Sequence, residues 1–125
     1  MFPSGSTTIT GLLAASLVML LGTPTAAHHS FSATYDSERE ITLQGVVTRI
    51  DWVNPHAFIF VNDADADDGS VTNWAVEFGN PFDLESAGWT EDSLQAGTVV
   101  AIEGIPARGQ SKRAFGSSVV RVSTG

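Results

Sequence analysis

Five segments of this 125-residue chain alternate apolar and polar side chains in the period of β-strands. Strands are predicted over residues 40–52, 56–61, 71–78, 99–104 and 114–123. A short helix is predicted over residues 81–87, because Asn80 suits an N-cap, Pro81 the first helical position and Gly88 the residue after the last turn. Three strands, a helix and two strands is the chain order of a small OB-like barrel. The sequence therefore predicts a mainly β, five-stranded OB-like Greek-key barrel, with an open five-stranded sheet or sandwich as the alternative.

The first strand is unusually long, and Gly45 lies in its middle. A glycine inside a strand marks a bend or a bulge. We expect the strand to bend at Gly45, so that it belongs to two sheets at once, and we expect substitution of Gly45 to be poorly tolerated.

Residues 9–22 form an uncharged apolar segment that is shorter than the roughly 20 residues of a membrane-spanning helix. Thr25, Ala26 and Ala27 follow it and supply the small residues of a cleavage site. The sequence thus predicts a signal peptide over residues 1–27 and a single domain over residues 28–125, periplasmic or secreted, with no stable membrane insertion after processing. Residues 1–8 contain no Lys or Arg, which departs from the usual signal-peptide pattern. An uncleaved N-terminal anchor is the alternative. Residues 28–39 are expected to form an extended arm that docks through Phe31 and Tyr35.

The composition excludes several classes of protein. The chain has no cysteine, which excludes disulfides, thiolate metal sites and cysteine nucleophiles. Both methionines, Met1 and Met19, lie in the predicted signal peptide, so the processed chain has no sulfur. A net charge of −8 argues against nucleic acid as a partner, since nucleic acid requires a basic face.

Two motifs carry a resemblance that extends over essentially the whole processed chain. One is the His-His-Ser-Phe start at residues 28–31, and the other is the Trp-x-Asn-Pro-His motif at residues 52–56. With these motifs the chain resembles an uncharacterised family of small exported bacterial proteins, a domain of unknown function. The resemblance implies export and a single β-rich domain, and it implies no activity.

The candidate metal ligands are the three histidines, His28, His29 and His56. Cleavage before His28 would place a free amine and an imidazole on one residue, and His56 could complete a nitrogen site. Nitrogen ligands without sulfur favour Cu(II), followed by Zn(II) or Ni(II). Cleavage one residue earlier would instead let the amine, two backbone amides and His29 form a square-planar site. The alternative is a solvated terminus and a turn histidine with no metal.

The remaining candidates are less specific. The aspartates of residues 63–68 lack the spacing of a calcium loop and predict a solvated hairpin loop, with weak divalent binding as the lesser alternative. The aromatic side chains are expected mainly in the core, or as a face that binds an apolar ligand or a partner; they are Trp52, Phe58, Phe60, Trp74, Phe78 and Trp89.

The sequence shows no catalytic constellation. Glu77 and Glu103 lie among apolar residues of predicted strands, where partial burial would raise the pKa of a carboxyl group, but neither has an evident partner. The alternative for Glu77 is an ordinary carboxylate at the end of its strand. The first functional hypothesis is therefore an exported small binding module that binds Cu(II) or another divalent metal through its histidines. The second is a structural or envelope-interaction protein without metal, with another exported protein or a small ligand as its partner. An enzyme is the least supported class.

Overall fold

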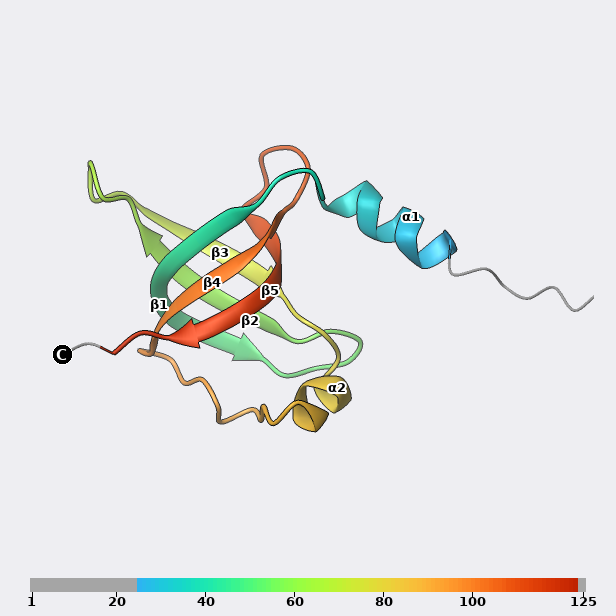
Figure 1. Cartoon of the computed structure of the whole chain (residues 1–125). Coiled ribbons are helices and arrows are strands. Elements are labelled where there is room, and N and C mark those ends of the chain that lie inside the picture. The colour runs from blue at the N-terminus through green and yellow to red at the C-terminus, as the bar shows by residue number, and fades with distance from the viewer. Residues whose placement is uncertain (1–24, 124–125) are drawn as a thin grey trace, which may run out of the picture.

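The computed structural model describes residues 25–123 and places five strands and two short helices in them (Figure 1). The elements in chain order are α1 (Thr25–Thr34), β1 (Ile41–Asp51), β2 (Phe58–Ala64), β3 (Val71–Glu77), α2 (Pro81–Ser86), β4 (Val99–Pro106) and β5 (Arg113–Arg121). The predicted signal peptide lies outside the described residues, apart from the last three positions, which belong to α1.

The strands close into a barrel in the order β1-β2-β3-β5-β4, and β4 pairs back with β1. All neighbouring strands are antiparallel except β3 and β5, which run parallel over three residue pairs, Ala75–Glu77 against Arg113–Phe115. We call this short parallel pairing the seam. The predicted OB-like barrel is confirmed, and its closure rests on this short seam, since residues 71–74 of β3 and 116–121 of β5 extend beyond the three paired positions.

Strand β1 pairs with β4 through residues 41–46 and with β2 through residues 45–51, so Gly45 belongs to both ladders, as predicted. A Cβ atom on Gly45 would lie 2.7 Å from the carbonyl carbon of Asn62 and 2.9 Å from Cγ1 of Val61. Glycine is required because β2 passes directly over this position. The bulge itself lies slightly further along, between Val47 and Arg49.

The inward-facing side chains of all five strands and of the segment after α2 form one core. Its largest fully buried side chains are β-branched, and these fit the concave inner face of a small barrel; they are Val47, Val61, Val76, Val100 and Ile102.

Helix α2 covers one end of the barrel and forms where the sequence predicts it (Figure 1). The Asn80 side chain accepts a hydrogen bond from the backbone N–H of Asp83, and Pro81 occupies the first turn. Gly88 follows the C-cap with φ +94°, a conformation that L side chains rarely adopt.

Helix α1 replaces the extended arm that the sequence predicts, so that prediction is wrong in conformation. Four residues of extended chain would separate Phe31 and Tyr35 by about 13 Å, whereas one helical turn stacks them on one face. Their ring centroids lie 5.0 Å apart, and both rings pack against Phe115 of β5. The expected docking through these two rings is confirmed.

The aromatic residues do not all lie in the core, where most of them were expected. Phe78 is buried, but Trp52, Trp74 and Trp89 are only half-buried. Phe58 and Phe60 stack on each other, with their centroids 6.3 Å apart, on the outer face of β2. Strand alternation explains this, because Ile59 and Val61 take the inward positions of the same strand.

Candidate functional site

A buried carboxylate at the seam is the centre of the candidate site. Glu77 is the last residue of β3, and it points outward because its neighbours Val76 and Phe78 belong to the core. It is nevertheless only 6% exposed. Its cover is the N-terminal arm, in which Tyr35 forms an isolated antiparallel bridge with Ala107.

Three side chains from distant parts of the chain donate to Glu77. His56 Nδ1 lies 2.5 Å from Glu77 Oε1, and Arg113 Nη2 lies 2.6 Å from Oε2. The Tyr35 hydroxyl also donates to Oε2 and itself accepts from Arg113 Nε at 2.9 Å. We call these four residues the Glu77 cluster. Every oxygen of the buried carboxylate therefore has a partner, as a buried charge requires.

The partners keep Glu77 ionised. Burial alone would raise the pKa of its carboxyl group, but the hydrogen bonds from Tyr35 and Arg113, with the charges of Arg113 and His56, hold it below its ordinary value. Burial, followed by the hydrogen bond to Glu77, raises the pKa of Tyr35 from 10.0 to about 12. The pKa of Arg113 is raised, chiefly by its hydrogen bond to Glu77. Glu77 is thus buried at the end of its strand, as the sequence allowed, but its pKa is lowered and not raised. Glu103 is exposed, with Ser118 as its hydrogen-bond donor.

His56 is held in one orientation by this arrangement. It follows the cis peptide bond between Asn54 and Pro55, and its side chain is 49% exposed. Because an ionised carboxylate only accepts, Nδ1 must carry the hydrogen, so the nitrogen that can release its proton and offer a lone pair is Nε2. The cluster thus presents one imidazole nitrogen as an oriented ligand or base.

The structure does not describe the side chains of the other two predicted ligands, His28 and His29. His28 and His29 belong to the backbone of α1, but their side chains lie outside the described part of the structure. Among the described residues, no group of three His, Cys, Asp or Glu side chains surrounds a possible metal position. Whether His28 and His56 share an ion remains a prediction.

The acidic loop uses its carboxylates to hold its own turn. The backbone N–H groups of Asp67 and Asp68 donate to Asp65 Oδ1, and that of Ser70 donates to Asp68 Oδ1. This agrees with the predicted hairpin loop between β2 and β3.

Sequence reasoning missed Arg113 and the role of Tyr35. Arg113 stands at the end of a polar loop, and its separation of 36 residues from Glu77 hides the pair. Tyr35 was predicted only as a docking ring. The available signal was strand alternation, which puts Arg113 and Phe115 on the outer face of β5, beside Glu77 in the seam.

The comparison with protein families gives a direct match. The model of a family of unknown function, DUF6152, matches residues 15–115. The chain belongs to DUF6152. The matched range contains all four residues of the Glu77 cluster, and the uncharacterised family predicted from the sequence is confirmed. No curated protein matches this DUF6152 chain.

Solved structures share the barrel of this DUF6152 protein. The S. cerevisiae mitochondrial single-stranded DNA binding protein Rim1 matches with TM-score 0.52 and 9% identity in crystal form 2, and with TM-score 0.51 and 10% identity in form 1. Each match covers 70% of this chain and 96% of Rim1. A chain of the S. pombe Stn1–Ten1 complex matches with TM-score 0.48 and 22% identity, over 67% of this chain and 58% of that one. At such identities, the likeness to Rim1 shows the fold alone.

Neither helix within residues 25–123 is long and apolar enough to cross a membrane.

Proposed function

We propose that this DUF6152 protein is an exported binding module for Cu(II), and that His56 is the ligand that the barrel fixes in place. The observation that carries the proposal is the contact of 2.5 Å between His56 Nδ1 and Glu77 Oε1. Metal-binding histidines usually donate their second ring N–H to a carboxylate or a carbonyl, which fixes the tautomer and strengthens the ligand. Glu77 supplies this support and leaves Nε2 of the half-exposed ring open to an ion.

The chemistry of the available ligands favours Cu(II). The processed chain would hold imidazole and amine nitrogens and no sulfur, because Met1 and Met19 would leave with the signal peptide. Cu(II) heads the affinity order of divalent ions for such nitrogen ligands, with Zn(II) and Ni(II) behind it.

The processed N-terminus would supply the remaining ligands, His28 and His29. Tyr35 anchors the arm to the same carboxylate as His56, and the backbone of His28 lies seven residues, or about 10 Å of helix, before it. Cleavage before His28 would leave seven residues of α1, which is well below the roughly 12–15 residues that a stable isolated helix needs. The first turn can therefore unwind and bring His28 back to His56.

Nucleic acid is not proposed as the ligand, although Rim1 is a single-stranded DNA binding protein of the same fold. The outer face of β2 does carry stacked aromatic rings, with the Arg49 guanidinium 4.0 Å above Phe60 and that of Arg113 5.2 Å from Phe58. Each arginine is also paired with a carboxylate, Arg49 with Asp51 at 3.0 Å and Arg113 with Glu77. This pairing neutralises the local positive charge, and the chain as a whole carries −8.

Titration of the exported, processed protein with Cu(II), followed by calorimetry and electron paramagnetic resonance, tests the proposal. We expect a Kd below about 1 μM, and a loss of at least tenfold for His56→Ala and for His28→Ala. Glu77→Gln keeps the size of the side chain but removes the charge that orients His56, so we expect affinity to fall by about 10–100-fold. The matched control is the same protein with one extra N-terminal Met, which displaces the amine from His28 and should weaken binding.

Two results would overturn the proposal. Binding weaker than micromolar that none of the histidine substitutions changes would leave the histidines as surface residues. Tight binding that depends on His29 and ignores His56 would place the ion on the free N-terminus, away from the barrel.

A further inference from the structure

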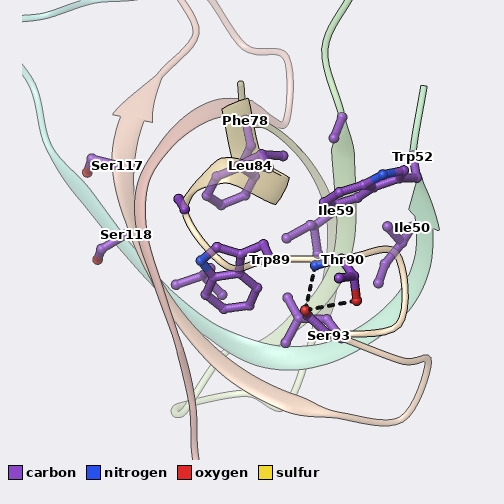
Figure 2. Close-up of a pocket in the computed structure, with 14 residues that line it drawn as sticks. Ile50, Trp52, Ile59, Phe78, Leu84, Trp89, Thr90, Ser93, Ser117 and Ser118 are labelled. Carbon is purple, nitrogen blue, oxygen red and sulfur yellow. Dashed lines mark hydrogen bonds between the residues drawn. The ribbon is translucent and has the colours of Figure 1, made fainter. Parts of the chain in front are cut away.

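A cavity of about 320 Å³ opens at the end of the barrel beneath α2. Figure 2 shows the Trp52 ring along one side of this cavity and β5, with Ser117 and Ser118, on the other, while Leu84 and Phe78 lie together at one end. The volume falls in the lower part of the range of about 300–1,000 Å³ that small-molecule sites occupy. We call it the mouth cavity.

The walls of the mouth cavity are mostly apolar. Ile59, Phe78 and Leu94 form a buried floor that belongs to the hydrophobic core. Trp52 and Trp89 add two half-buried rings above it. Apolar surface left open to water is unfavourable, and a ligand that covers it is bound by the hydrophobic effect.

The rim of the mouth cavity is held by hydrogen bonds, so the site is formed before a ligand arrives. Trp52 Nε1 donates to Glu85 Oε1 of α2 at 3.4 Å. The backbone N–H of Thr90 donates to Ser93 Oγ at 2.7 Å, which holds the segment after α2 in a turn (Figure 2). A preformed site saves the entropy that ordering these segments would cost on binding.

The polar groups around the mouth cavity are few and uncharged. They are the indole N–H groups of Trp52 and Trp89 and the hydroxyl groups of Thr90, Ser93, Ser117 and Ser118, and none of the described residues that line the cavity carries a charge. The Ser117 and Ser118 hydroxyls donate to Glu103, so the groups nearest a ligand are those of Trp89, Thr90 and Ser93. An ionised ligand would lose its hydration with no opposite charge to replace it, which is costly. A neutral ligand with one hydrogen-bonding group would suit both the apolar walls and these few uncharged polar groups.

From these observations we propose that the mouth cavity binds a small, uncharged, mainly apolar molecule with a ring or branched body and a single hydrogen-bonding group. This site is separate from the proposed copper site, since His56 does not line it. The two proposals can therefore fail independently.

The test uses a matched pair of fluorescent probes, neutral N-phenyl-1-naphthylamine and its anionic counterpart 1-anilinonaphthalene-8-sulfonate, titrated into the purified protein. We expect saturable binding of the neutral probe with a Kd of about 10 μM or tighter, and at least tenfold weaker binding of the sulfonate. Energy transfer from tryptophan should accompany binding, because two of the three tryptophans line the cavity.

Two matched variants locate the probe. Ala87→Phe adds a ring at an exposed position that lines the cavity and has φ −85°, open to any residue, so it should weaken binding at least tenfold. Ser86→Phe adds the same ring at the neighbouring exposed position of α2, which does not line the cavity, and it should bind like the wild type. His56→Ala should also bind like the wild type. Thermal unfolding of each variant verifies that it is folded.

Several outcomes would overturn this proposal. The cavity is not the site if Ala87→Phe, folded as stably as Ser86→Phe, binds the neutral probe as tightly. The preference for a neutral ligand is wrong if the sulfonate binds equally well. Absence of saturable binding to the wild type would remove the site altogether.

Discussion

Gly45 offers the sharpest test of how this barrel is built. In Gly45→Ala the new methyl group would lie 2.7 Å from the backbone carbonyl carbon of Asn62. It would also lie 2.9 Å from Cγ1 of the Val61 side chain. Real Cβ contacts essentially never fall below 3.0 Å, and the obstacle here is backbone that cannot rotate away. Strands β1 and β2 must therefore separate at this point by something on the order of 1 Å to restore ordinary contact.

The cost of this separation can be worked out from the ladder. Gly45 pairs with Asp63, Val46 with Asn62 and Val47 with Val61, so opening the strands here weakens about two backbone hydrogen bonds, at roughly 1 kcal/mol each. Overpacking adds about 1–3 kcal/mol, and the smaller entropy of the unfolded Ala chain returns about 0.4–1 kcal/mol. We expect Gly45→Ala to lower the free energy of unfolding by about 3 kcal/mol. For a domain of this size, this corresponds to a fall in Tm of roughly 12–24 °C.

Thermal unfolding followed by circular dichroism, together with urea unfolding, measures this change. The matched control is Gly79→Ala, because a Cβ atom on Gly79 would have nothing within 4 Å and its φ is not positive. The control should be neutral, or stabilised by about 0.4–1 kcal/mol. If Gly45→Ala unfolds within about 0.5 kcal/mol of the wild type, then the close approach of β2 does not constrain β1, and the reasoning fails.

Two further predictions concern the Glu77 cluster and the outer face of β2. Tyr35 is the chain's single tyrosine, so an ultraviolet titration of the folded protein reads it alone and should give a pKa of about 12, falling toward 10.0 in Glu77→Gln. Because the pKa of Tyr35 is raised on folding, the stability that Tyr35 contributes is complete below pH 10 and is lost as the pH rises toward 12. Tyr35→Phe should abolish this pH-dependent loss. A wild-type protein in which Tyr35 titrates at the ordinary value of 10.0 would contradict the cluster. Fluorescence anisotropy with a labelled oligothymidine should show no binding at 0.15 M salt, and a Kd in the micromolar range or tighter would refute the neutralisation of Arg49 and Arg113 by their carboxylates.

Much of the fold could be predicted from residues that act on their own segment of the chain. Asn80, Pro81 and Gly88 specify the ends of α2 by their own backbone chemistry, and each takes the predicted position. Gly45 likewise predicts the position at which β1 pairs with both β2 and β4. The conformation of the arm was not predictable in the same way. Its helical form brings Phe31 and Tyr35 together on Phe115, a residue that lies 80 or more positions further along the chain.

The site was harder to predict because its geometry is non-local. The sequence indicates His56 as a candidate ligand and Glu77 as a carboxylate that could be buried. The direction of the pKa shift of Glu77 depends on Tyr35 and Arg113, which are 42 and 36 residues away. Burial alone raises a carboxyl pKa, whereas donors from Tyr35 and Arg113 lower it, and only the closed barrel brings those donors in. The same holds for Trp52 and Trp89, whose place beside a cavity depends on where α2 lies across the barrel.

The parallel seam also determines when along its synthesis the chain can fold. Of the five strands of the barrel, β5 is the last to leave the ribosome, and it must pair with both β3 and β4 before the barrel closes. Until then, both of these strands keep an open edge, and Glu77 lacks the guanidinium of Arg113 that compensates its burial. The four earlier strands can pair among themselves, but the barrel that buries their inward-facing side chains cannot close until β5 is made. For a protein exported as proposed here, a barrel that cannot close before β5 is made would favour a nascent chain that is still able to pass through a narrow secretion channel.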